Sequence, residues 1–426
     1  MPEAAAPVPI RESRRQLVSM RDAEAESLKA LGRELAGQST WWGSDSGADA
    51  SESGGATSAI HVRKAESDLW EVRVSDAIGV IRVGDQTLVV QPKIPMGHVL
   101  GLLSEAGTLP RTSSAPVQVS AGAHLFDLIA SWLLTATQTV LRGDLIKQFQ
   151  THREVLPHVR GRINPAQTAG LLLRGRPQVD CEFDDLDIDN PTNRVLRAAV
   201  ARIARSPLAQ STLRRTATQL LVHFQGVGDL RRGDASAAVT RQTWYYRDAL
   251  QLANVILAGF ALTLREGSLG GSAFLLRTPE AVEAGLRSLL TRGLADECAV
   301  TKKGLQLTPS TKTLNPDLVF DNGSAVGDVK YQLQGTDWDT GHIYQATTFA
   351  TGYRASHALV ITFRDGETAR PSLQIGDVDV TNICWDARDE TPYETAAERV
   401  VEDVRDWLPT REPASGHPEA LALATG

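Results

Sequence analysis

The fold of the C-terminal part of the chain is decided by residues 314–330, LNPDLVFDNGSAVGDVK. Leu318-Val319-Phe320 is apolar and β-prone, and the following Asp-Asn-Gly-Ser segment predicts a hairpin turn because Asn and Gly tolerate positive φ. If Asn and Gly form the tip, Asp317 lies opposite Asp328 on the neighbouring strand. Lys330 then points to the same face as Asp328, because side chains alternate along a strand.

This arrangement predicts a cation site. Two facing carboxylates repel each other unless a positive charge lies between them. A hard divalent cation such as Mg²⁺ prefers carboxylate oxygens, and a nearby ammonium can stabilise charge on a phosphate or align a water. Asp317, Asp328 and Lys330 therefore suit phosphodiester hydrolysis. The alternative is a surface hairpin on which Asp328 and Lys330 form a solvated pair.

The pattern Pro316-Asp317 … Asp328-Val329-Lys330 resembles the PD-(D/E)XK nuclease motif. Motifs this short also occur by chance, so the flanking sequence has to support the resemblance. In this superfamily a helix before the motif strands often supplies a further acidic residue, and Glu283 of the helix predicted over 279–290 matches it. Glu280 is the competing residue, but its position fits a partner of the helix dipole better.

A second helix is predicted to begin at His342 and carries Gln345 and Phe349. These two residues match a Gln-x-x-x-aromatic element that many nucleases of the superfamily carry, which implies that Gln345 orients the lysine or a water. Helix, hairpin, helix and an apolar strand over 358–363 make an α/β order. The resemblance implies Asp317, Asp328 and the carbonyl of Val329 as Mg²⁺ ligands. It implies Glu283 as a further ligand or as a residue that organises the attacking water.

Composition restricts the class of protein. The chain has 426 residues, 42% of them hydrophobic, and a formal net charge of −7. A stand-alone DNA-binding protein is usually basic, so this acidic balance indicates local basic patches or a partner that holds the DNA. No apolar run approaches the about 18–20 residues of a membrane span. The start lacks a secretory signal and the three cysteines match no zinc spacing, so we expect reduced thiols, a cytoplasmic location and no membrane association.

The predicted fold class is α+β and multidomain, with a small N-terminal β unit, a helical partner-docking region and a C-terminal α/β nuclease domain. The predicted units are 1–57 (flexible tail, helix and linker), 58–107 (small β domain), 108–270 (mostly helical partner-binding domain), 271–392 (PD-(D/E)XK nuclease domain) and 393–426 (helix and tail). Trp41-Trp42 and the Gly- and Ser-rich segment 43–56 have no function that the sequence indicates.

Three elements before the hairpin resemble McrC, the nuclease subunit of McrBC modification-dependent restriction systems. They are Ile78-Gly79-Val80-Ile81 with residues 88–94, Val159-Arg160-Gly161-Arg162-Ile163, and the acidic run 181–189 followed by Asn190 to Leu196. The resemblance implies an Mg²⁺-dependent DNA endonuclease that docks on and stimulates a McrB-like AAA+ GTPase hexamer. That partner would recognise modified cytosine and translocate double-stranded DNA. The sequence has no Gly-x-x-x-x-Gly-Lys-Ser/Thr loop, which agrees with nucleotide hydrolysis in the partner.

Two other functions fit parts of the sequence. One is a self-sufficient PD-(D/E)XK nuclease in DNA repair or recombination. The other is a non-cleaving AAA+ activator with a vestigial site, although the intact Asp, Asp, Lys and Gln set argues against it. Arg160, Arg162 and Arg194 also have two interpretations: they pair with the acidic run, or they contact the partner.

Overall fold

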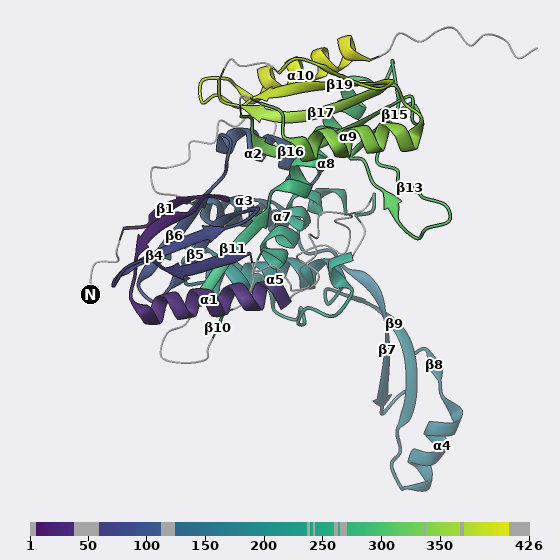
Figure 1. Ribbon diagram of the computed structural model, residues 1–426. Coiled ribbons are helices and arrows are strands. Elements are labelled where there is room, and N and C mark those ends of the chain that lie inside the picture. The colour runs from purple at the N-terminus through teal and green to yellow at the C-terminus, as the bar shows by residue number, and fades with distance from the viewer. Residues whose placement is uncertain are drawn as a thin grey trace, which may run out of the picture. The chain divides into compact units, whose positions relative to one another are not determined.

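The computed structural model of the chain describes residues 6–37, 59–111, 124–236, 239–241, 243–259, 263–264, 271–335, 337–366 and 370–408. These residues form a mixed α+β structure with several sheets, which confirms the α+β part of the predicted fold class (Figure 1). Trp41-Trp42 and segment 43–56 lie outside them. No helix in the described ranges is long and apolar enough to cross a membrane. The described chain divides into a first unit, up to Pro92 and from Gly107 to Thr278, and a second unit, Lys93–Ala106 and from Pro279 onward.

Two sheets build the core of the first unit. The five-stranded sheet has the order β1 (Val8–Arg11), β6 (Gln86–Gln91), β5 (Ala77–Val83), β11 (Gly271–Arg277) and β10 (Thr263–Leu264). The three-stranded sheet has the order β2 (Gln16–Ser19), β4 (Leu69–Val74) and β3 (Ile60–Lys64). Helix α1 (Asp22–Gly37) contributes an apolar stripe that packs into the same core.

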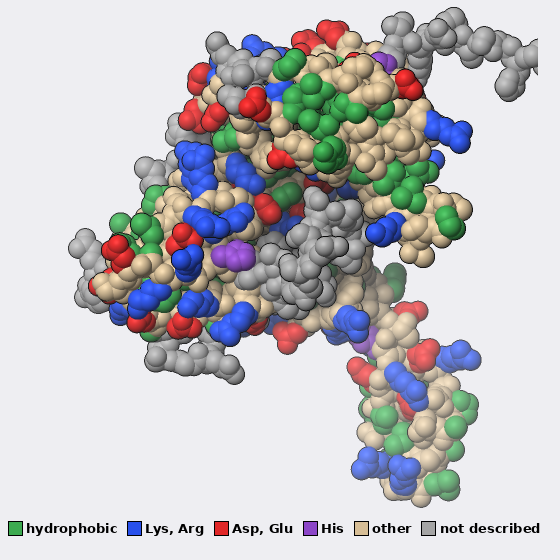
Figure 2. Space-filling view, viewed as in Figure 1, with side chains coloured by type: hydrophobic (Ala, Val, Ile, Leu, Met, Phe, Trp, Pro, Cys, Tyr) green, Lys and Arg blue, Asp and Glu red, His purple; other side chains and the backbone are tan. Residues whose placement is uncertain are grey.

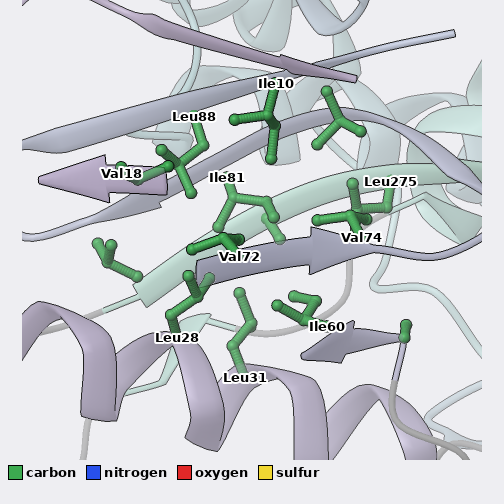
Figure 3. Packing of buried hydrophobic residues seen from close by; sticks show 14 of the residues in the cluster. Ile10, Val18, Leu28, Leu31, Ile60, Val72, Val74, Ile81, Leu88 and Leu275 are labelled. Carbon is green, nitrogen blue, oxygen red and sulfur yellow. The ribbon is translucent and has the colours of Figure 1, made fainter. Parts of the chain in front are cut away.

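The alternation of buried and partly exposed side chains along β4 explains this packing. Trp70, Val72 and Val74 are buried, whereas the intervening Glu71 and Arg73 are partly exposed. Figure 3 shows Val72 and Val74 in one cluster with Leu28 and Leu31 of α1, Ile10 of β1 and Leu275 of β11. The core of the first unit therefore draws on residues that are far apart in the sequence.

Three features of this unit differ from the sequence predictions. Residues 8–11, predicted as tail, form β1, whose parallel pairing with β6 buries Ile10. The strands between residues 60 and 91, predicted to form one small β domain, divide between two sheets. Residues 271–277, assigned to the nuclease domain, form β11 and pair with β5 along seven residues. Each difference arises from strand pairing over long sequence separations, which local patterns do not report.

The rest of the first unit is only partly helical. Its helices are α3 (Leu125–Arg142), α5 (Pro191–Arg205), α6 (Ser211–Leu221) and α7 (Arg247–Ala258), with 3-10 turns at Val222–Phe224, Asp234–Ser236 and Trp244–Tyr246. Between α3 and α5 the chain forms β7 (Gln148–Leu156), β8 (Arg162–Ile163), α4 (Pro165–Leu173) and β9 (Val179–Asp187). We call these four elements the arm. In Figure 1 its paired β7 and β9 run from the region of α5 out to α4.

The second unit is built on a six-stranded sheet. Its order is β12 (Val300–Thr301), β15 (Leu318–Phe320), β16 (Ala325–Leu333), β17 (His357–Arg364), β19 (Val378–Asp386) and β18 (Leu373–Ile375). Helix α9 (Thr340–Tyr353) connects the parallel strands β16 and β17 and packs on Val326, Val360 and Val380. Helix α10 (Tyr393–Trp407) packs on β19 from the other side of the sheet (Figure 1).

Helix α8 (Pro279–Gly293) is fixed by a close approach to helix α2 (Met96–Glu105). A Cβ at Gly285 would lie 2.3 Å from the Leu102 carbonyl oxygen, so this contact requires glycine. The approach positions the turn of α8 that carries Glu283.

The neighbouring segments 300–302 and 305–307 predict an edge hairpin from the sequence, and this prediction is wrong. Strand β12 pairs with β15, whereas β13 (Leu305–Gln306) pairs with β14 (Thr313–Leu314). Strands β13 and β14 are consecutive and are joined by residues 307–312, whereas β12 and β15 are separated in the sequence by both of them.

Candidate active site

Strands β15 and β16 form the predicted hairpin in the predicted register. Leu318 pairs with Gly327, so Asp317, immediately before β15, is next in register to Asp328. The turn residues Asp321, Asn322 and Gly323 have φ values of 41°, 61° and 117°, in the left-handed region that Asn and Gly tolerate. The Val329 N–H donates to Asp317 Oδ2 at 3.0 Å. This hydrogen bond orients the Asp317 carboxylate toward the strand that carries Asp328.

Lys330 joins the hairpin to helix α9. Its Nζ lies 2.8 Å from Asp328 Oδ2 and donates to Gln345 Oε1 at 2.7 Å. Phe349, one turn further along α9, is buried. The Gln-x-x-x-aromatic element thus places its amide on the lysine and its ring in the core.

Two further side chains complete the cluster. Glu283 arrives from α8, and Lys302, the residue after β12, lies between Glu283 and Asp317. Lys302 Nζ is 3.2 Å from Asp317 Oδ1 and 3.6 Å from Glu283 Oε2. Lys302 is not among the residues predicted from the sequence. Its position depends on the pairing of β12 with β15, in which Thr301 faces Val319, and no local motif signals that pairing.

Burial and neighbouring negative charge raise the pKa of Asp328 and of Glu283. For Asp328, which is 5% exposed, burial and then the neighbouring Asp317 raise the pKa to about 7, although Lys330 opposes the change. For Glu283, burial and then Asp317 raise the pKa to about 8, against the effect of Lys302. The site therefore holds less positive charge than three ionised carboxylates require.

The donor chemistry of this cluster fits a hard divalent cation. Asp317, Asp328 and Glu283 offer carboxylate oxygens, which are the ligands that Mg²⁺ prefers. Within the described ranges, however, no three His, Cys, Asp or Glu side chains are already arranged to hold a metal ion. Instead the ammonium groups of Lys302 and Lys330 lie against the carboxylates. A metal ion would have to take over part of this neutralising role.

Replacing Glu283 with glutamine is expected to stabilise the metal-free protein at high pH. The folded-state pKa of Glu283, about 8, lies above its unfolded value, so its contribution to stability is complete at low pH and is lost as pH rises through about 8. Glutamine imitates the protonated acid and avoids this loss, which we expect to be on the order of 2 kcal/mol. Melting temperatures of both proteins in EDTA, measured from about pH 5 to pH 9, check this. Parallel pH profiles would contradict it.

A protein-family model described as McrBC 5-methylcytosine restriction system component matches residues 72–362, more than half of the chain. The chain belongs to the McrC family. The resemblance to McrC that was stated from the sequence is thereby confirmed. The matched residues of this McrC-family chain include Glu283, Lys302, Asp317, Asp328, Lys330 and Gln345.

Two individual proteins show how far the similarity extends. The type IV methyl-directed restriction enzyme EcoKMcrBC of Escherichia coli (strain K12) is 26% identical over 141 residues, which cover 33% of this chain and 40% of the relative. The match thus spans less than half of the relative. A chain in the refined half-complex from the tetradecameric assembly of Thermococcus gammatolerans McrB AAA+ hexamers with bound McrC has a TM-score of 0.66 at 14% identity. It covers 95% of this chain and 100% of its own length, so the similarity of fold spans nearly the whole molecule.

Proposed function

We propose that this McrC-family protein is the DNA endonuclease subunit of a McrBC-like restriction system, with a Mg²⁺-dependent PD-(D/E)XK site in its second unit. The observation that carries the proposal is the meeting of Asp317, Asp328 and Lys330 at one hairpin, with Glu283 and Gln345 brought in by α8 and α9. The description of the family supports DNA with 5-methylcytosine as the substrate.

Each side chain has a distinct role in this proposal. Asp317, Asp328 and Glu283 would hold Mg²⁺, with the Val329 carbonyl contributing; the ion supplies charge stabilisation at the phosphate and lowers the pKa of a water. Lys330 would align the attacking water or stabilise the negative charge that develops on the phosphate. Gln345 is a positioning residue, because its Oε1 accepts the Lys330 hydrogen bond and limits where the ammonium can point.

We further propose that the arm docks the chain on a McrB-like AAA+ GTPase hexamer. The arm exposes large apolar side chains, among them Phe149 at 72% and Leu173 at 88%. Figure 2 shows hydrophobic, basic and acidic side chains intermingled on this element. An element that carries several exposed large apolar side chains is a candidate surface for binding a partner. The net charge of −7 supports a partner that holds the double-stranded DNA, and the three free cysteines suit the cytoplasm.

One cleavage experiment tests the function. The full chain is incubated with Mg²⁺ and with methylated or unmethylated DNA, in the presence and absence of the AAA+ partner and GTP. We expect cutting only when methylated DNA, partner and nucleotide are all present. Cutting without the partner would favour a self-sufficient nuclease. GTPase stimulation with no cutting under any condition would favour the non-cleaving activator.

Replacing Phe149 and Leu173 together with serine is expected to weaken partner binding by about tenfold or more, because exposed apolar anchors dominate interfaces. The melting temperature should stay unchanged, since both side chains are exposed in the free protein. Leu17→Ser is the matched control, because Leu17 is 62% exposed on β2, outside the arm. Dissociation constants for the partner check the prediction, and equal affinities for all three proteins would exclude the arm as the docking element.

A further inference from the structure

Lys302 lies where two carboxylates of the proposed site converge. We propose that its ammonium is the resident counter-ion of the Glu283–Asp317 pair in the metal-free protein, and that a divalent metal ion binds by displacing it. Lys302 would thus control the metal affinity of the site. The inference rests on the proposed metal-dependent nuclease function and adds a residue that the PD-(D/E)XK pattern does not contain.

The contacts of Lys302 support the role of a counter-ion. Its Nζ lies 3.2 Å from Asp317 Oδ1 and 3.6 Å from Glu283 Oε2, so one ammonium group lies close to two carboxylates. These distances suit the compact charge of lysine, which neutralises without the fixed forked geometry of arginine. The ammonium therefore lies against two of the oxygen donors that a divalent cation would use.

The Lys302 side chain is also placed so that it can move away from the two carboxylates. The Lys302 side chain is 45% exposed, whereas those of Asp317 and Glu283 are 10% and 21% exposed. Lys302 follows the two-residue edge strand β12, and Lys302 to Gly304 pair with no strand. The carboxylates of Asp317 and Glu283 are thus largely buried. The Lys302 side chain reaches them from the solvent side, and its ammonium can return to solvent.

The second lysine of the site is held differently. Lys330 is 19% exposed, lies on the interior strand β16, and contacts both Asp328 and Gln345. Its position is fixed from two sides. The cluster therefore contains one lysine that stays at the reaction centre and one that a metal ion can replace.

Metal binding to the full chain tests this assignment. Lys302→Met is compared with wild type by calorimetric titration with Mg²⁺ and by thermal unfolding in EDTA. We expect the variant to melt at a lower temperature in EDTA, because the two acids lose their shared counter-ion. It should bind Mg²⁺ about tenfold more tightly, because no ammonium competes at a few ångströms.

Lys303→Met is the matched control. It makes the same change in net charge one residue away, at an exposed side chain with no ion pair to the site among the described residues. It should leave the melting temperature and the Mg²⁺ affinity close to those of wild type. Lys302→Arg keeps the charge and adds a second contact to the acids, so it should bind Mg²⁺ more weakly than wild type.

The outcomes separate the two proposals. Unchanged or weaker affinity in Lys302→Met, or an equal gain in Lys303→Met, would overturn the role of Lys302 and leave the nuclease proposal standing. If Lys302→Met does not fold, an affinity of Lys302→Arg equal to or above wild type would overturn that role. An Asp317→Asn variant is titrated beside the wild type. If neither protein binds Mg²⁺, both proposals fail.

Discussion

DNA cleavage is expected to fall by at least about 10³-fold when Lys330 is replaced with alanine, while the partner still binds. Lys330 Nζ contacts Asp328 and Gln345, so its loss removes the ammonium from the proposed reaction centre. No other described side chain reaches Asp328 with an ion pair. Single-turnover cleavage with saturating partner and Mg²⁺, together with the dissociation constant for the partner, measures the two effects separately.

Lys312→Ala is the control for the lysine substitution, because Lys312 is exposed between β13 and β14. It should cut at the rate of wild type. Asp317→Ala should reproduce the loss seen for Lys330→Ala, since the two side chains belong to one site. Wild-type rates from either site variant would remove the hairpin from the mechanism.

Replacing Arg194 with methionine is expected to destabilise the first unit by about 3–5 kcal/mol. Arg194 is 5% exposed, and its Nε and Nη2 donate to Asp234 at 2.8 and 3.0 Å. Its Nη1 donates to Asp189 Oδ1 at 3.1 Å. The side-chain hydrogen bond from Arg194 holds the pKa of Asp234 below its usual range. Without Arg194, the buried Asp234 loses its counter-ion.

Arg197→Met is the matched change on the same helix. Arg197 pairs with Asp229, which is 96% exposed, so we expect a loss of no more than about 1 kcal/mol. Denaturant midpoints for both variants give the comparison, and equal losses would contradict the buried network. The structure thus gives Arg194 a structural role, as the counter-ion of buried and partly buried acidic side chains in the first unit. Arg160 also pairs with the acidic run, through Asp185 at 2.7 Å, but both side chains of that pair are close to half exposed.

The sequence could predict the hairpin because its information is local. Turn chemistry sets the tip at Asn322 and Gly323, and strand alternation then sets the register of Asp317, Asp328 and Lys330. The contact of Gln345 with Lys330 could also be predicted, because helix α9, which carries Gln345, follows the hairpin directly in the chain. These parts of the site needed no knowledge of distant segments.

Lys302 and the edges of the units could not be predicted in this way. Lys302 reaches Asp317 only because β12 pairs with β15, and β1 and β11 join sheets through partners far away in the chain. Two residues of β12 carry too little pattern to identify their partner strand. Non-local pairing was therefore the missing information, both for the fold and for the site.

The two units are interleaved along the chain. This limits the order in which they can fold during synthesis and the fragments into which the protein can be cut. Helix α2 belongs to the second unit but is synthesised before most of the first, and β11 is an interior strand of the first unit just before α8. The five-stranded sheet cannot be completed until residue 277 has left the ribosome. A fragment that begins at Pro279 would contain every proposed catalytic residue but lack the helix that packs against Gly285. No single proteolytic cut releases both units intact.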